Sequence, residues 1–427
     1  MKLYHAYKKQ FRVLILLLVF TIPIVFSYAQ TIDDLNTKIN QRNNDILALE
    51  KEIASYQNQL DDIGKQKVSL NSSIQQLDLT RKKLSADIAV TENKIENTNS
   101  KIEELSSQIG DKEEKIQNDT EAIKLEIRKT NELELNSIAE TILSENDFTS
   151  AWNDIDNMAS VREKIRGSIN ELQQIKGQLE DNRKETTDAR NELLTLKSTL
   201  NDQKKIVDQN TNEKKKLLAQ TKNNETNYQK LLKDRIAKKD AFEKDLRDYE
   251  SQLKYILDTS KLPQAGVLSW PLDSILVTQR FGKTEAGKRL YATGSHNGVD
   301  FRASVGTPVK AMADGIVSGT GDTDIQCPGV SFGRFVLIKY NNGLASTYGH
   351  LSLIKVSIGQ KVARGEVVGY SGNTGYSTGP HLHVSVYARD AVDLKTLPSK
   401  SCPGHVLTQP ISPINAYLDP LYYLPHL

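Results

Sequence analysis

Residues 84–123 read LSADIAVTENKIENTNSKIEELSSQIGDKEEKIQNDTEAI, with an isoleucine at every seventh position from Ile88 to Ile123. The same phase starts upstream and is interrupted only at Lys67 and Arg81; its members are Ile39, Ile46, Ile53, Leu60, Ile74, Ile88, Ile95, Ile102, Ile109, Ile116 and Ile123. A second apolar seam lies three positions further on, at Leu49, Tyr56, Ile63, Leu70, Leu77, Leu84 and Leu105. Together the two seams place an apolar residue every 3.5 positions on average in a polar background. This pattern specifies a left-handed coiled coil.

The heptad pattern weakens at residues 137–159 and returns beyond them. We therefore expect a coiled-coil region over residues 30–259, with two long helices folded back antiparallel and short helices near residues 137–159 at the far end. A single rod that dimerises in parallel fits the same heptads, so the oligomeric state stays open. Phe148 and Trp152 lie four residues apart and would share one helix face, where they either cap the hairpin core or dock on a partner.

The first thirty residues have the composition of an export signal. Basic residues precede an apolar run at 13–26, and small residues follow at 27–29. This order is typical of a secretory signal peptide, here residues 1–29, and it predicts export to the periplasm, the cell envelope or the outside of the cell. A retained membrane anchor is the alternative, but the run is shorter than the roughly 20 residues that span a bilayer.

Length and charge narrow the classes of function. At 427 residues the chain is too long for one compact core. Its 56 basic and 54 acidic residues nearly cancel, so the composition gives no reason to expect a nucleic-acid partner. After Pro263 glycine becomes frequent, and valine and isoleucine alternate with polar residues. This change predicts a β-rich domain at residues 260–427.

Both cysteines of the chain lie in this C-terminal part. Cys327 and Cys402 could oxidise to one disulfide that ties an internal loop to the C-terminal tail of an exported protein. Two free thiols are the alternative. A zinc site built from these cysteines is disfavoured, because neither has a CxxC partner.

Four of the seven histidines lie between residues 296 and 383. His296 precedes Asp300 by four positions, and His381 precedes His383 by two in a stretch that alternates like a strand. Residues two apart in a strand point to the same face, so His381 and His383 should face one cleft. Two imidazoles, one carboxylate and a water form the open tetrahedral site of a catalytic zinc ion, which lowers the pKa of that water to about 7. The remaining imidazoles, His350 among them, suit proton transfer near neutral pH; histidines scattered over core and surface are the alternative.

Short glycine-rich motifs surround these residues. They are QRFG at 279–282, HNGVDF at 296–301, GTPV at 306–309, ADG at 313–315, TYGHL at 347–351, GQKV at 359–362, and TG at 374–375 leading to HLH at 381–383. With these motifs, residues 266–389 resemble the lysostaphin/LytM family of zinc metallo-endopeptidases. The resemblance implies a compact, mostly antiparallel β-sheet fold (the duplicated hybrid motif) with an open groove. It also implies Zn2+ on His296, Asp300 and His383, with His350 and His381 assisting the water, and peptidoglycan peptides as substrate.

Two features depart from that family. Its His-x-His motif is usually followed by an aromatic residue and a glutamate, where this chain has Val384 and Ser385. Neither position is a metal ligand in the family, so we expect an altered polarity of the groove and no loss of catalysis. The segment 321–333, which carries Cys327, looks like an inserted loop that could reshape one wall of the groove.

The whole layout of signal peptide, coiled coil and lysostaphin-like domain resembles the EnvC-type murein hydrolase activators. In that group the β-domain often lacks zinc ligands and activates a separate cell-wall amidase. The coil docks there on a membrane complex of the division machinery, and a helix can mask the groove. Three functions therefore compete: a secreted zinc metallo-endopeptidase of peptidoglycan positioned or restrained by its coil, a non-catalytic activator, and a structural spacer. A domain that only binds has no physical need for all five polar groups, so their presence favours the enzyme.

Overall fold

The computed structural model describes residues 32–64, 69–134, 148–253, 255–283, 294–399 and 401–426. The predicted signal peptide at 1–29 lies outside the described residues. Within the described part, no helix is both long enough and apolar enough to cross a membrane.

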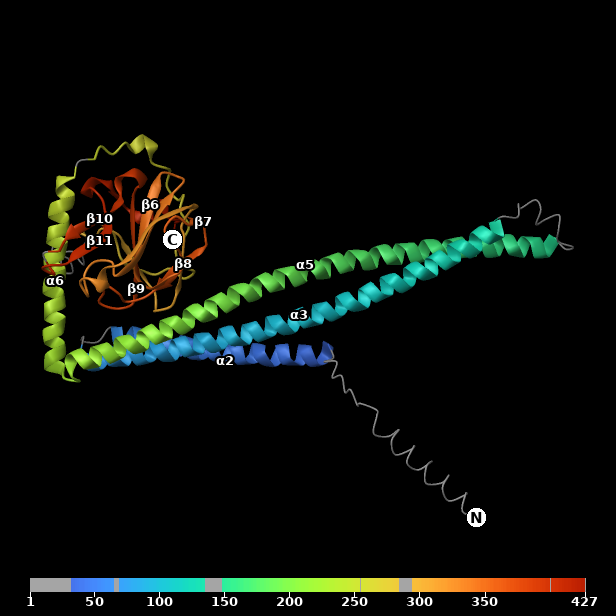
Figure 1. Ribbon diagram of the computed structural model, residues 1–427, viewed down its shortest axis with the longest axis horizontal. Helices are drawn as coiled ribbons and strands as arrows, with labels where there is room; N and C mark the ends of the chain where they lie inside the picture. The colour runs from blue at the N-terminus through green and yellow to red at the C-terminus, as the bar shows by residue number, and fades with distance from the viewer. Residues whose placement is uncertain are drawn as a thin grey trace, which may run out of the picture. The chain divides into compact units, whose positions relative to one another are not determined.

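Four helices make up the region that the heptads predict to be helical: α2 (Ile32–Gly64), α3 (Leu70–Glu134), α5 (Phe148–Thr221) and α6 (Glu225–Gln252). Helices α3 and α5 run antiparallel (Figure 1). Gln108 of α3 accepts a hydrogen bond from Asn182 of α5 at 3.0 Å. Nearer the start of α3, Asp78 pairs at 2.6 Å with Lys214, which lies nearer the end of α5. Helices α3 and α5 thus form an antiparallel hairpin, and seam residues such as Leu105 of α3 are buried.

The helical region is divided at two places that the heptad pattern does not predict, so it holds four described helices instead of two. Between α5 and α6, Lys222 and Asn223 adopt left-handed backbone angles, with φ of 51° and 52°. Asn224 then caps α6, because its side chain accepts a hydrogen bond from the Asn227 amide at 3.2 Å. Asparagine favours both roles, so the Asn223–Asn224 pair is the sequence signal of this turn. The other break follows Gly64, a poor helix former.

The predicted short helices near residues 137–159 are not confirmed. Residues 135–147 lie outside the described part, and residues 148–159 are the first turns of the long helix α5. The side chains of Phe148 and Trp152 also lie outside the described part, so their capping or docking role stays a prediction.

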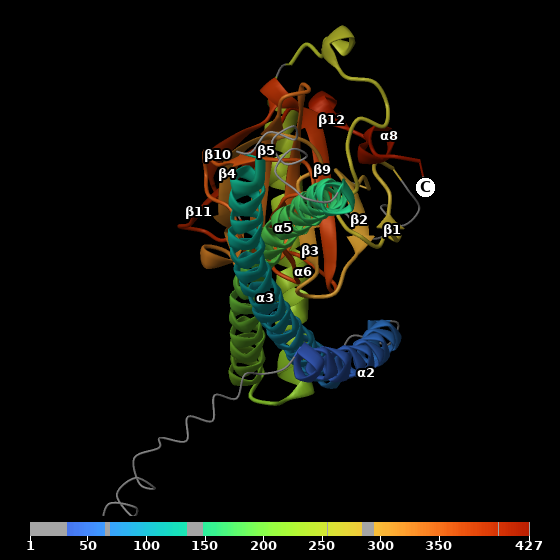
Figure 2. The same cartoon turned by 90° about the vertical axis from the view of Figure 1, so that its right-hand side faces the viewer.

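The C-terminal part is an antiparallel β-domain, which confirms the predicted fold class. Its main sheet follows the order β1-β2-β9-β6-β5-β4-β7; β8 pairs with β6 and β3, and β12 pairs with β9. Strands β10 and β11 form a separate hairpin that contacts β4 (Figure 2). The bounds are β1 (Val277–Gln279), β2 (Val299–Arg302), β3 (Pro308–Lys310), β4 (Gly315–Asp322), β5 (Arg334–Tyr340), β6 (Leu344–Ile354), β7 (Lys361–Val362), β8 (Val367–Ser371), β9 (His381–Ala388), β10 (Asp393–Pro398), β11 (Val406–Ile411) and β12 (Tyr417–Leu418), with a short helix α8 (Pro420–Tyr423) at the end.

A buried apolar cluster fills the β-domain and fixes the strands that carry the histidines. Leu382 and Val384 of β9 are fully buried in it, so the alternation of the strand directs His383 to the other face of the sheet. Tyr348 of β6 is also fully buried. Its hydroxyl accepts a hydrogen bond from the Met312 amide at 2.9 Å, so the polar group is satisfied inside the core.

The chain divides into two compact units, and one of them combines helix ends with the β-domain. This unit consists of Asn44–Glu96 and Asn191–Leu427. Within it, Tyr370 of β8 is buried against Leu84 of α3 and Ile206 of α5. Helix ends and β-domain therefore share buried apolar surface, although the sequence analysis placed them in separate domains.

A disulfide joins Cys327 to Cys402, with their Cα atoms 5.9 Å apart. Cys327 belongs to the segment 321–333, and Cys402 belongs to the connection between β10 and β11. The bond therefore ties this segment to the β10–β11 hairpin. Phe242 of α6 packs on both, in a buried cluster with Cys327, Val330 and Leu407. The segment and the hairpin thus provide the surface on which α6 rests.

Candidate metal centre

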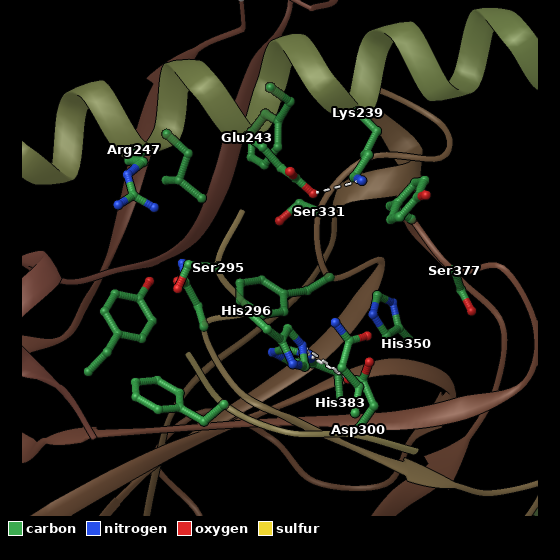
Figure 3. A pocket seen from close by; sticks show the side chains of 18 of the residues that line it. Lys239, Glu243, Arg247, Ser295, His296, Asp300, Ser331, His350, Ser377 and His383 are labelled. Atoms are coloured by element: carbon green, nitrogen blue, oxygen red, sulfur yellow. Dashed lines mark hydrogen bonds and ion pairs between the residues drawn. The ribbon is translucent and has the colours of Figure 1, made fainter. Parts of the chain in front are cut away.

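The sheet register brings the predicted ligands together. Strands β2 and β9 are neighbours, and their antiparallel register places Asp300 directly opposite His383. Strand β6 lies on the other side of β9, with Gly349 opposite His383, so His350 comes from the adjacent strand. Figure 3 shows these side chains and that of His296, which lies just before β2, at the bottom of one pocket.

His296, Asp300 and His383 form a group that could hold a metal ion, with one donor atom of each within 4.8 Å of the others. The Asp300 Oδ1 atom lies 2.9 Å from Nδ1 of His383 and 3.3 Å from Nε2 of His296. The two imidazole nitrogens are 3.1 Å apart. Donors held about 2.0–2.1 Å from one tetrahedral zinc ion would be roughly 3.3 Å from each other. The donor set and its spacing therefore fit a zinc site.

Each of the two imidazoles in this group has a partner for its other nitrogen. Nδ1 of His296 lies 3.2 Å from the carbonyl oxygen of Arg280, and Nε2 of His383 lies 2.8 Å from Oγ of Ser385. A carbonyl oxygen only accepts, so Nδ1 of His296 carries the hydrogen and Nε2 is its acceptor nitrogen. For His383, donation from Nε2 to Ser385 leaves Nδ1 as the acceptor that faces Asp300. Such partners fix the tautomer and ring orientation that a metal requires.

Gly298 makes room for the His383 ring. A Cβ atom at this position would lie 2.7 Å from Nε2 of His383, closer than real side chains approach one another. A larger residue would therefore displace the ring from Asp300. This close approach explains the glycine in the HNGVD stretch in physical terms.

His350 and His381 complete the group. Nδ1 of His350 donates to the carbonyl oxygen of Thr374 at 2.8 Å, and Nδ1 of His381 donates to that of Gly379 at 2.8 Å. Both rings therefore offer Nε2 as a proton acceptor. Their centroids are 4.6 Å apart, and Nε2 of His381 lies 3.7 Å from Oδ1 of Asp300. The structure thus brings together all five residues that the sequence singled out.

The protonation states suit metal binding. Burial lowers the pKa of His350 well below its usual value, and burial also lowers the pKa of His383, so both rings are neutral near pH 7. Burial alone would raise the pKa of Asp300. The neighbouring imidazoles of His381, His296 and His383 outweigh this effect and hold the pKa of the Asp300 carboxyl well below its usual range. Neutral imidazoles and an ionised carboxylate are the forms that coordinate a metal.

Ser385 is a site residue that the sequence analysis passed over as a departure from the family motif. The signal was present, because Ser385 follows His383 by two positions on β9 and must share its face. Replacing Ser385 by alanine should weaken zinc binding by roughly 10- to 100-fold, the usual cost of removing a partner of a metal-binding histidine. Competition with a chromophoric chelator measures this affinity. Ser318→Ala on β4 is the matched control, and equal affinities of the two variants would show that Ser385 does not orient His383.

Helix α6 forms the opposite wall of the pocket, which the sequence did not predict. The pocket encloses about 220 Å³; α6 contributes Lys239, Phe242, Glu243, Leu246, Arg247 and Glu250 to its lining. The β-domain contributes the five site residues on the other side. Figure 3 shows α6 running across the pocket, with the side chains of Lys239 and Glu243 between the helix and the histidines.

Comparison with known proteins gives matches in the same part of the chain. Residues 294–394 match peptidase family M23. The peptidoglycan DD-endopeptidase ShyA of Vibrio cholerae serotype O1 is 45% identical over 94 residues, which are 22% of this chain and 20% of that protein. The cell division protein DipM of Caulobacter vibrioides is 35% identical over 133 residues, which are 31% of this chain and 20% of that protein. This chain thus aligns with about a fifth of the length of each of these curated relatives.

Among solved structures, the catalytic domain of the antimicrobial peptidase lysostaphin from Staphylococcus simulans is 34% identical. The alignment covers 27% of this chain and 81% of that chain, with a TM-score of 0.24. The family match and the paired ligand strands fall on the same residues, from just before β2 to β10. We conclude that the C-terminal β-domain of this chain carries a peptidase family M23 domain.

Proposed function

We propose that this protein is a secreted zinc metallo-endopeptidase that hydrolyses peptide bonds of peptidoglycan. The observation that carries the proposal is the complete donor set, with His296, Asp300 and His383 around one point and His350 and His381 beside them. The name of the relative ShyA, a peptidoglycan DD-endopeptidase, supports the substrate class. The predicted signal peptide supports export to the periplasm or cell envelope.

The five site residues have two different chemical roles. A zinc ion bound by His296, Asp300 and His383 would polarise the substrate carbonyl and lower the pKa of a water molecule. His350 and His381 present Nε2 to the pocket, where one of them accepts the proton of the attacking water. The protonated ring then gives this proton to the leaving amine. The carbonyl groups of Thr374 and Gly379 keep both rings oriented during these transfers.

Digestion of purified peptidoglycan by the zinc-loaded full-length chain tests this function. New amino termini, identified by mass spectrometry, would support it. If the chain binds one zinc ion and releases no termini, even after α6 has been loosened, the endopeptidase proposal is wrong. A non-catalytic activator would give that second result and would stimulate an added cell-wall amidase.

We also propose that α6 restrains the peptidase by occupying the groove. Phe242 anchors the helix on the disulfide-linked surface and is 8% exposed. Further along, Glu250 accepts a hydrogen bond from the Tyr417 hydroxyl at 2.7 Å. A peptide substrate needs the space that Lys239 and Glu243 fill, so α6 must move before the substrate binds. The relative DipM is named a cell division protein, which supports a role of this protein in cell division. Docking of the helical region on a division complex at the membrane stays a prediction from the sequence resemblance.

Glu250 makes this restraint depend on pH. Burial raises the pKa of Glu250 to about 7 from 4.5, although the Tyr417 hydroxyl, the Ser412 amide and the charge of Arg247 lower it. In the released helix the carboxyl would be exposed, so the docked state binds more protons between pH 4.5 and 7. The stability of the docked state is therefore highest below pH 4.5 and falls as pH rises through 7, by about 3 kcal/mol at most.

Hydrogen exchange of the α6 amides should therefore show more frequent opening as pH rises from about 5 to 8, after correction for intrinsic exchange rates. Glu250→Gln keeps a neutral hydrogen-bonding side chain and should flatten this dependence. Asp248→Asn, at an exposed position of the same helix, is the matched control. A Glu250→Gln chain with the wild-type pH dependence would contradict the assignment.

A further inference from the structure

Lys239 of α6 is a buried cation in the wall of the site pocket. Its side chain is 2% exposed, and its Nζ atom lies 3.2 Å from Glu243 and 3.6 Å from Asp240. The same ammonium lies 4.3 Å from the centroid of the Tyr376 ring. A buried lysine is rare and is stabilised only when its charge is well paired. Asp240 and Glu243 belong to α6 itself, so the Tyr376 ring is the group that the β-domain offers to this ammonium.

The β-domain holds Tyr376 in place by its own contacts. The Tyr376 amide donates to the carbonyl oxygen of Ser331 at 2.9 Å, and the Gly375 amide donates to Asp324 at 2.7 Å. Gly333 and Gly375 approach so closely that a side chain on either would strike the backbone of the other. None of these contacts involves α6, so the ring should keep its place when the helix leaves.

A carboxylate lies in the wall near Tyr376. Asp324 belongs to the segment 321–333, and its two oxygens accept hydrogen bonds from the backbone amides of Gly329 and Gly375, which carry no charge. The neighbouring Asp322 is paired with Arg334 at 3.0 Å. Against this wall α6 places a second cation, because the aliphatic part of Arg235 packs on Gly329. Opposite charges thus face each other across the groove.

We propose that the wall centred on Tyr376 is a subsite for a cationic group of the substrate, which Lys239 occupies while α6 lies over the groove. The corresponding ligand is a peptide with a free ammonium group, on a side chain or at an amino terminus, near the bond that is cut. This inference rests on the proposed peptidase function, because it concerns the substrate of that enzyme. Binding of an ammonium group at Tyr376 can nevertheless be measured without any hydrolysis. Lys239 acts in cis as a mimic of the substrate cation.

Hydrogen exchange of α6 in the full-length chain tests the subsite without any hydrolysis. Lys239→Met keeps the length of the side chain and removes its charge, so opening of α6 should increase roughly 3- to 30-fold. Lys239→Arg should leave it near the wild-type value. The increase should largely disappear in the Tyr376→Leu background and persist in Tyr376→Phe, which separates the ring contact from the Glu243 ion pair. Lys244→Met, at an exposed position of the same helix, is the matched control.

A second arm identifies the ligand. An alanine-rich peptide with a blocked amino terminus and one lysine, added in millimolar excess, should compete with Lys239 and increase opening of α6. The same peptide with its lysine acetylated should not. An equal response to both peptides, no response to either, or unchanged exchange in Lys239→Met would overturn the proposal. Hydrogen exchange reports binding and not hydrolysis. A chain that responds only to the peptide with the free lysine, but does not cut peptidoglycan, would therefore refute the peptidase function and leave the subsite intact.

Discussion

Replacing His383 by alanine is expected to abolish the proposed hydrolysis of peptidoglycan. His383 supplies the nitrogen that lies 2.9 Å from Asp300 and 3.1 Å from His296, so its loss leaves two donors where zinc needs three. Zinc provides several kcal/mol of transition-state stabilisation, and each 1.36 kcal/mol is a factor of ten. The rate should therefore fall by at least about 1,000-fold.

Two measurements on each variant separate the roles within the site. Metal analysis should find no bound zinc in His383→Ala, whereas His350→Ala should retain zinc and lose roughly 100- to 10,000-fold in rate. A chelator should abolish wild-type activity, and added zinc should restore it. His405→Ala, at an exposed histidine outside the pocket, is the control and should behave as wild type. Activity that survives in His383→Ala would mean that the metal lies elsewhere.

Loosening α6 is expected to activate the enzyme. Phe242 is the apolar anchor of the helix, buried with Cys327, Val330 and Leu407. Truncating a buried phenylalanine costs about 3–5 kcal/mol in a protein core, and a helix that rests on a surface should lose somewhat less. Phe242→Ala should therefore increase opening of α6 by about 10- to 1,000-fold, and the rate of peptidoglycan digestion should rise until most molecules are open.

The test compares digestion rate with exchange of the α6 amides in the same samples. Ile236→Ala is the matched control, because Ile236 lies on the same helix with 43% of its surface exposed. This variant should change neither quantity. If Phe242→Ala opens the helix and the digestion rate stays constant, α6 does not restrain the enzyme and the groove is accessible by another route.

The site residues could be predicted because each lies in a short motif whose local geometry is restricted. His381, His383 and Ser385 share one face of a strand by parity, and Gly298 allows the close approach that puts His383 beside Asp300. The contact between His383 and Ser385 follows from the same parity. Ser385 departs from the family motif, but its position on β9 is enough to place it on the same face as His383.

The helical part was predicted less completely. Heptad periodicity shows which helix face is apolar, but it fits both an antiparallel hairpin and a parallel dimer. The structure shows the antiparallel pairing of α3 and α5 within one chain. The turn at 222–224 and the separate helix α6 were not predicted. The apolar positions Phe242 and Leu246 continue a helical pattern, and that pattern is the same whether the partner is another helix or a β-domain.

By itself, the sequence determined the composition of the site, the β-rich character of the C-terminal domain and the apolar faces of the helices. These features depend on the spacing of residues along the chain. Residues at a regular spacing lie on the same face of a helix or strand because the local backbone geometry repeats. Only the tertiary structure decided that α6 lies across the groove and that Lys239 meets Tyr376. Such contacts join residues that are distant along the chain, and they depend on packing and charge complementarity between surfaces, which no local period encodes.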